Sequence, residues 1–149
     1  MSGRRILPIL AAALLVAGCG GHANPIIRPA PLEAWIAIEQ TYVPKREAAR
    51  QHISDSEQSF DEQLIGYRDF LTATKGWLAD VRKVSDWGPA KDDVQGFLSA
   101  GDDEVVTLTA VAGSETADDA NVVGANLAQE EADFVTAVAL VRSDLGLSN

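Results

Sequence analysis

Hydrophobic side chains along this chain recur with the period of an α-helix. In residues 60–85 the apolar positions alternate between spacings of four and three, and a second line at a spacing of seven runs beside them. Together they form a stripe wide enough to be packed from two sides, which is typical of a helix in a bundle. The first line comprises Phe60, Leu64, Tyr67, Leu71, Thr74, Leu78, Val81 and Ser85, and the second Phe70, Trp77 and Val84. The members that we expect to be buried together are Leu64, Leu71, Leu78 and Val81.

Proline, glycine and capping residues divide the helical pattern into four segments. Pro89 suits the first position of a helix, Gly113 ends the segment that follows, and Gly146 fits as a C-cap. No stretch alternates between apolar and polar residues as a half-buried strand would. The sequence therefore predicts an all-α, antiparallel four-helix bundle. The predicted helices are residues 31–53 (kinked at Pro44), 56–85, 89–112 and 117–145, and the apolar faces of the last two comprise Val94, Phe97, Leu98, Val105, Leu108 and Val111, then Val123, Leu127, Phe134, Val138, Val141 and Leu145.

Pro44 makes the first helix harder to predict. A proline inside a helix removes one backbone donor and disfavours helical geometry in the residue before it. Two outcomes stay open: a kinked helix over 31–53, or a short helix to about residue 42 and a long one over 44–85. The charges favour a break near Ser54, because basic residues precede it and acids follow it, as helix dipoles prefer. The sequence Ser54-Asp55-Ser56-Glu57 also fits a capping box.

The N-terminus has the features of a secretory signal peptide. Arg4 and Arg5 precede an uncharged apolar run, residues 6–17. This run is shorter than the roughly 20 residues that a transmembrane helix needs, and Pro8 interrupts it. A basic start, a short apolar region and small residues at its end are typical of a cleaved signal. The proline also favours ordinary secretion over twin-arginine export.

Residues 15–19, Leu-Val-Ala-Gly-Cys, resemble the lipobox of bacterial lipoproteins. The resemblance covers residues 1–19 and implies that residues 1–18 are removed and that Cys19 is acylated. It thereby implies an anchor on the outer side of the cytoplasmic membrane, or in the periplasm or outer membrane if the cell has one. Anchoring is stable when two or more chains are attached. We expect residues 19–30 to form a flexible tether and residues 31–149 to form the helical-bundle domain.

Charge is distributed unevenly along the chain. The formal net charge is −10, and residues 85–149 hold thirteen acids against two bases. Such a half repels nucleic acid and anionic headgroups, so we expect no nucleic-acid partner. The simpler interpretation is that these acids only keep the surface solvated. The more specific interpretation is that they form a docking face for a basic protein partner. The possible ligand or partner contacts are Trp87, which we expect to be partly exposed in its turn, and Asp102, Asp103 and Glu104.

Motifs for catalysis or metal binding are weak. His22 and His52 are the only histidines, so a di-iron bundle with paired Glu-x-x-His motifs is excluded. Residues 119–130 match part of an EF-hand loop, but Val123 and Leu127 stand where oxygen ligands or a bound water belong. The chain has no nucleophile elbow and no phosphate-binding glycine loop. We therefore expect no enzymatic activity, no cofactor and no bound metal.

Two functions remain open at this level. The first is a membrane-anchored envelope lipoprotein whose domain is a non-enzymatic interaction or accessory module. The second is a carrier or sensor that binds a small apolar or cationic ligand within the bundle, in a cavity lined by residues such as Tyr67, Phe70, Trp77 and Phe97. A tightly packed core favours the first function, and a connected apolar pocket favours the second.

Overall fold

Helices account for every regular element in the part of the chain that the structure, a computed structural model, describes: residues 30–55 and 57–148. The prediction of an all-α fold is therefore confirmed for these residues. The elements are α1 (Pro31–Ser54), α2 (Phe60–Lys83), the short 3₁₀ helix η1 (Gly88–Ala90), α3 (Lys91–Ala112), α4 (Ala117–Val123) and α5 (Leu127–Asp144).

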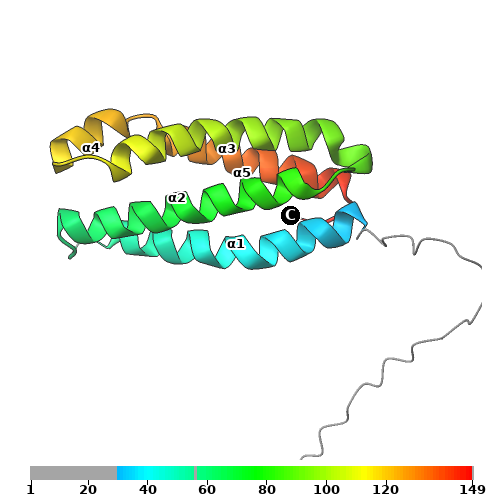
Figure 1. Ribbon diagram of the computed structural model, residues 1–149, viewed down its shortest axis with the longest axis horizontal. Helices are drawn as coiled ribbons and strands as arrows, with labels where there is room; N and C mark the ends of the chain where they lie inside the picture. The colour runs from blue at the N-terminus through cyan, green and yellow to red at the C-terminus, as the bar shows by residue number, and fades with distance from the viewer. Residues whose placement is uncertain (1–29, 56, 149) are drawn as a thin grey trace, which may run out of the picture.

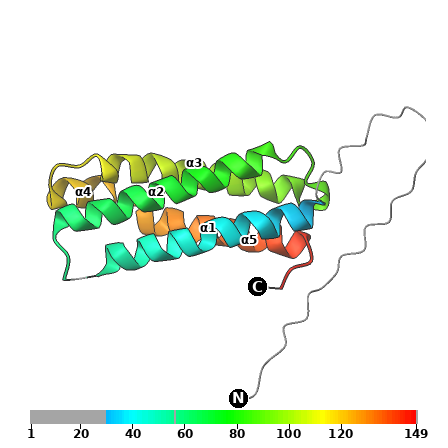
Figure 2. The ribbon, with the colours of Figure 1, turned by 60° about the horizontal axis from the view of Figure 1, so that its bottom comes forward.

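The long helices lie lengthwise beside one another in an elongated, bundle-like body (Figure 1). Along this body α1 packs against α2, α2 against α3, and α3 against α5. In the view of Figure 2, α1 and α5 run below α2 and α3. The chain enters α1 at one end of the body, and the short helix α4 lies at the opposite end, where it packs against α3.

The start of α2 is set by a capping box, but not by the predicted one. Ser59 is the N-cap: the backbone N–H of Glu62 donates to its hydroxyl, and the backbone N–H of Ser59 donates to the Glu62 carboxylate at 2.8 Å. The Ser59 hydroxyl also donates to this carboxylate at 2.8 Å, and the hydrogen bonds from the Ser59 backbone and hydroxyl lower the pKa of Glu62. The expected start at residue 56 is therefore wrong. The helix begins four residues later, because Ser59 and Glu62 together satisfy two of the backbone N–H groups that a helix start leaves unpaired.

Pro44 does not divide the first helix, since α1 continues through it from Pro31 to Ser54. The predicted break near Ser54 is confirmed, and the alternative of a long helix over 44–85 is wrong. The helix is held on both sides of the proline by the core, because Tyr42 packs against buried aromatic rings and Arg46 is buried. Such tertiary contacts offset the one backbone hydrogen bond that the proline removes.

The fourth predicted helix, residues 117–145, is two helices. The chain leaves α4 at Gly124 and begins α5 at Leu127. Glycine and asparagine are weak helix formers, and a Cβ at Gly124 would lie 2.9 Å from a methyl group of Val111 on α3. The turn thus allows close packing on α3, and it leaves Val123, which we expected in the core, 43% exposed.

Buried apolar residues form two groups along the body. The aromatic cluster lies toward the end where the chain enters, and the small cluster lies toward α4. The aromatic cluster comprises Ala34, Trp35, Ile38, Trp77, Leu78, Val81, Trp87, Ala90, Val94, Phe97, Phe134, Ala137 and Val141; the small cluster comprises Ala49, Phe70 and Leu108, with Ile53, Tyr67, Leu71 and Leu127 half-buried against it. Of the four α2 residues expected to be buried together, Leu78 and Val81 share the aromatic cluster, Leu64 is buried outside both clusters, and Leu71 is only half-buried, so the expectation holds for two of them.

A pair of glycines tests how closely the helices pack. A Cβ at Gly66 of α2 would lie 2.9 Å from the Ile53 side chain and 3.3 Å from the Ala49 carbonyl oxygen, whereas a Cβ at Gly96 of α3 would meet nothing within 4 Å. We expect Gly66→Ala to lower the free energy of unfolding by about 1–3 kcal/mol through overpacking. Gly96→Ala, the matched control, should raise it by about 0.5–1 kcal/mol through helix propensity. Urea unfolding of the two variants measures both, and a stabilised Gly66→Ala variant would contradict this α1–α2 contact.

Candidate functional site

A layer of polar side chains lies in the middle of the core, between the two apolar clusters. We call Arg46, Thr74, Glu104 and Glu131 the polar layer; α1, α2, α3 and α5 each contribute one of them. Arg46, Thr74 and Glu104 are buried, at 3%, 0% and 0% exposure. Buried charges are costly unless they are paired and hydrogen-bonded, so the contacts of this layer decide whether it can form.

Arg46 satisfies the layer's central carboxylate with two hydrogen bonds. Its two terminal nitrogens donate to the two oxygens of Glu104 at 2.6 and 3.0 Å, which is the bidentate geometry of a strong arginine–carboxylate pair. Arg46 also donates to the Thr74 hydroxyl and, at 3.3 Å, to Glu131. Glu104 therefore has both oxygens occupied, and Arg46 links all four helices of the layer.

Two phenyl rings cover the faces of the buried guanidinium group. The central carbon of Arg46 lies 4.3 Å from the ring centroid of Phe70 and 4.1 Å from that of Phe134. A cation in this position is attracted by the ring faces, and the attraction is stronger when the pair is removed from water. The rings belong to different clusters, so Arg46 joins the aromatic cluster to the small cluster.

The hydrogen bonds and ion pairs of the polar layer continue to the surface between α1 and α5, and we call the connected group the polar network. Arg50 pairs with Glu131 and, at 2.7 Å, with Glu47. The connected group then holds two arginines and three glutamates, with one more formal negative charge than positive. A further anion bound near this group would be repelled, because the group already contains more carboxylates than guanidinium groups.

The seam between α1 and α5 is bridged by long side chains. These two helices make far fewer close backbone contacts than the pairs α1–α2, α2–α3 and α3–α5. Ion pairs span the gap instead: both arginines of the network reach Glu131, and Arg142 donates to Glu39 at 2.7 Å. A groove of about 180 Å³ lies in this seam, and it is lined by Val43, Arg46, Glu47, Arg50, Trp77, Phe134, Val135 and Val138.

Trp77, at the groove, has an unused hydrogen-bond donor. Its side chain is 3% exposed, and its indole nitrogen Nε1 finds no acceptor among the described residues. The ring packs between α1 and α5, with the Tyr42 ring stacked at a centroid distance of 6.4 Å and the Phe134 ring edge-on at 5.4 Å. A buried donor without an acceptor costs free energy, and because Nε1 is itself inaccessible to solvent, the groove is lined by the ring of Trp77 and not by its donor.

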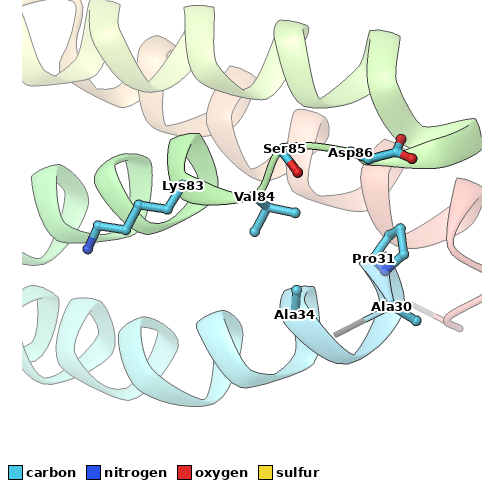
Figure 3. Close-up of a pocket in the computed structure, with 7 residues that line it drawn as sticks. All are labelled: Ala30, Pro31, Ala34, Lys83, Val84, Ser85 and Asp86. Carbon is cyan, nitrogen blue, oxygen red and sulfur yellow. The ribbon is translucent and has the colours of Figure 1, made fainter. Parts of the chain in front are cut away.

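Two larger recesses lie elsewhere on the body. Figure 3 shows one at the end where the chain enters, between the start of α1 and the residues after α2; its volume is about 660 Å³. Pro31 and Ala34 form one side and Val84 and Asp86 the other, while the amine of Lys83 extends away from it. The other, of about 640 Å³, runs between α1 and α2 over small side chains.

A second polar contact clamps α1 to α2 beside that α1–α2 recess. Tyr42 donates to Asp80 at 2.7 Å, and Lys83 donates to the other oxygen at 2.6 Å. The hydrogen bonds from Lys83 and Tyr42 lower the pKa of Asp80. The hydrogen bond that Tyr42 donates to Asp80 raises the pKa of Tyr42, because loss of the phenol proton would place two negative charges together.

The sequence-predicted contact residues do not form one surface. Trp87 is 6% exposed and packs edge-on against Trp35, so the expectation that it is partly exposed is wrong. Glu104 is buried in the polar layer, so it is not available to a docking partner. Asp102 and Asp103 are exposed, and Asp102 pairs with Arg82 at 2.6 Å. Cys19 lies outside the described residues.

The polar layer carried a signal that the sequence analysis missed. On α3 the buried positions follow the spacing of four and three through Phe97, Gly101, Glu104 and Leu108. Glu104 thus stands in the apolar stripe, although it follows two exposed aspartates and resembles part of a charged run. Arg46 stands likewise four residues after Tyr42, on the face that α1 turns to the core.

Breaking the central pair should be costly. Arg46→Met leaves Glu104 buried without its main partner, and we expect a loss of about 3–5 kcal/mol in the free energy of unfolding. The double variant Arg46→Met/Glu104→Leu should recover much of this loss, since both buried charges are then gone. The control is Arg82→Met, which removes an exposed pair and should cost at most about 1 kcal/mol. Chemical denaturation measures all three, and equal losses for Arg46→Met and Arg82→Met would contradict the proposed energetics.

Comparison with protein-family models, with curated proteins and with solved structures finds no match to this chain. Within residues 30–55 and 57–148, no helix is long and apolar enough to cross a membrane. In the same residues no three His, Cys, Asp or Glu side chains come together as a metal-binding group. The chain's own residues therefore carry the case for its function.

Proposed function

We propose that this chain is a lipid-anchored protein of the bacterial cell envelope and that its helical domain is a non-enzymatic interaction module. The observation that carries the proposal is the order of sequence features: a basic start, a short apolar run, the lipobox-like residues 15–19 and a segment rich in glycine and proline. The first helix begins directly after these features, at Pro31. A tether of twelve residues, 19–30, would reach at most about 40 Å.

We further propose that the architecture is an antiparallel four-helix bundle in which α4 and α5 together take the place of the fourth helix. Short links between successive long helices support this reading, as does the packing order α1, α2, α3, α5. In such a bundle the anchored end of the domain is the end where α1 begins. The α4 end would then face away from the membrane.

The charges suit this orientation. Residues 53–63 and 112–126, which make the turns at the α4 end, hold seven acids and no lysine or arginine. The opposite end carries Arg82, Lys83, Lys91 and Arg142 among its acids. An acidic end is repelled by anionic headgroups and attracts cationic surfaces. It also presents Val122, which is 77% exposed, so a basic protein with some apolar surface is the partner that this end fits.

A second candidate function is the binding of a small molecule between the helices. The observation that favours it is the groove between α1 and α5, whose lining includes the exposed apolar side chains of Val43 and Val135. The α1–α5 groove does not depend on the anchor, so both functions can belong to one protein.

Substitution of the cysteine tests the anchor. We expect Cys19→Ser to abolish acylation, because no thiol is then available, and to leave uncleaved or released protein. Incorporation of labelled palmitate and partitioning into a detergent phase measure this, with His22→Ala as a control that keeps the cysteine. Palmitate incorporation that persists in the Cys19→Ser protein would overturn the proposal.

Neutralisation of surface acids tests the interaction surface. Partners crosslinked to the anchored protein in membranes are identified first, and their association rates are then measured at two salt concentrations. We expect Glu115→Gln/Asp118→Asn, at the α4 end, to slow association at low salt, with the difference shrinking as salt screens the charges beyond ~8 Å. Asp102→Asn/Asp103→Asn, on the side of α3, tests the sequence-predicted contacts in the same way. Unchanged rates for both variants at low salt would remove these acids from the binding surface.

A further inference from the structure

The recess at the start of α1 lies where the chain enters the described part of the structure. Its volume is about 660 Å³, and its walls are the first residues of α1 and the segment that follows α2 (Figure 3). Ala30, the first described residue, is one of these walls. The volume falls in the range of roughly 300–1,000 Å³ that is typical of ligand pockets. The recess therefore has room for a few residues of chain.

The segment just before the recess carries side chains that suit it. Ile26 and Ile27 are the only large aliphatic residues within 19–30. The recess has apolar groups on both sides, from Pro31 on α1 and from Val84 beyond α2. Burial of isoleucine against such groups removes apolar surface from water, which is favourable. Glycine and serine, not isoleucine, are typical of a linker that stays free in water.

The start of α1 directs this segment toward the recess. A residue just before a helix N-cap often packs against the fourth residue of the helix, and this contact fixes the direction from which the chain enters. Ala30 is the N-cap of α1, so these two positions are Pro29 and Ala34, and Ala34 is a wall of the recess. Ile27 is only three residues from Ala30 and is therefore at most about 10 Å from it.

Two prolines lower the entropic cost of such a contact. The proline ring fixes φ, and it restricts the residue before it to extended conformations. Pro25 and Pro29 stand on either side of the isoleucines, so the segment has fewer conformations to lose when it binds. A pre-organised segment binds more tightly for the same contacts.

Charge at the recess favours the same occupant. Arg28 is the only lysine, arginine, aspartate or glutamate within 19–30. Asp86 is an exposed wall of the recess, whereas the amine of Lys83 extends away from it and pairs with Asp80 at 2.6 Å (Figure 3). A guanidinium group at this wall would be attracted by the carboxylate, and the phosphate of a lipid headgroup would be repelled.

We propose that residues 25–29 bind in the recess at the start of α1, with isoleucine against its apolar walls and Arg28 beside Asp86. Only residues 19–24 then remain free, with a reach of at most about 20 Å instead of about 40 Å. The bound segment holds the start of α1 close to the membrane and the α4 end away from it. This consequence rests on the proposed lipid anchor, whereas the contact itself does not.

Backbone mobility tests the contact directly. The full lipidated chain, labelled with ¹⁵N, is held in zwitterionic detergent micelles, and ¹⁵N relaxation gives the order parameter of each backbone amide. We expect the amides of Ile26 and Ile27 to approach the value of a rigid backbone, about 0.85, while the amide of Ala23 stays below about 0.6. Order parameters below about 0.6 at both isoleucines would overturn the proposal.

Matched variants separate binding in the recess from mere stiffness of the prolines. Val84→Ala removes part of an apolar wall, so the order parameters of both isoleucines should fall, whereas Val122→Ala changes an exposed side chain at the α4 end and should leave them unchanged. In the reverse test, Ile26→Ser/Ile27→Ser lies outside the described domain and should shift the methyl resonances of Val84 but not those of Val122. If Val84→Ala leaves the isoleucines ordered, or if the double variant leaves the Val84 resonances in place, the proposal fails.

Anionic lipid tests the other possible occupant. The chain is moved to nanodiscs of phosphatidylcholine with and without phosphatidylglycerol. We expect the Val84 methyl resonances to be the same in both. If they shift with phosphatidylglycerol while the Ile27 amide becomes mobile, a headgroup occupies the recess and the proposal is wrong. The released Cys19→Ser protein should keep both isoleucines ordered, so failure of the anchor and failure of the contact are distinguishable.

Discussion

The buried pair between Arg46 and Glu104 is the interaction on which the arrangement of the helices depends. Withdrawing each ion from water costs several kcal/mol, and only a well-matched partner offsets that cost. Here the match needs Thr74 from α2, Glu131 from α5 and a phenyl ring on each face of the guanidinium group. Sliding α1 or α3 by a turn would leave a buried charge without its main partner, and sliding α2 or α5 would remove a further acceptor of Arg46. We infer that the polar layer fixes the register of the helices, which an entirely apolar core would specify less strictly.

The polar layer also divides the core into unequal halves. On one side lie three tryptophans and two phenylalanines in mutual ring contact. On the other side Phe70 is the one buried ring among the described residues, and the buried side chains around it are smaller: Ala49, Leu64, Leu108, Val111 and Ala120. Regions with few buried apolar contacts open most easily. We infer that the α4 end, where the buried side chains are smaller, opens more easily than the aromatic end, and this end is also the acidic one.

Periodicity and turn residues were sufficient to predict the helical class and the ends of the four predicted helices within four residues, because long stripes of apolar residues leave few alternatives. Periodicity was not sufficient where the burial of a residue depends on a side chain far away in the sequence. Glu104 follows two exposed aspartates, and only the pairing with Arg46, 58 residues earlier, explains its burial. Trp87 lies in a turn, and η1 folds it back onto Trp35. Gly124, besides its weak helix propensity, lets the turn pack closely on Val111 of α3, and that contact cannot be seen in the local sequence. Tertiary contacts of this kind override local sequence signals.

The groove and the polar layer have one physical origin. Helices that meet through apolar side chains approach to about 8–10 Å, whereas an arginine and a glutamate joined end to end hold two helices farther apart. Glu131 accepts from both Arg46 and Arg50, and Glu39 accepts from Arg142, so the seam between α1 and α5 is set by such pairs. Between them the helices do not close, and the ring of Trp77 is left beside the opening. The charges that fix the register thus also leave a groove between α1 and α5, with the ring of Trp77 in its lining.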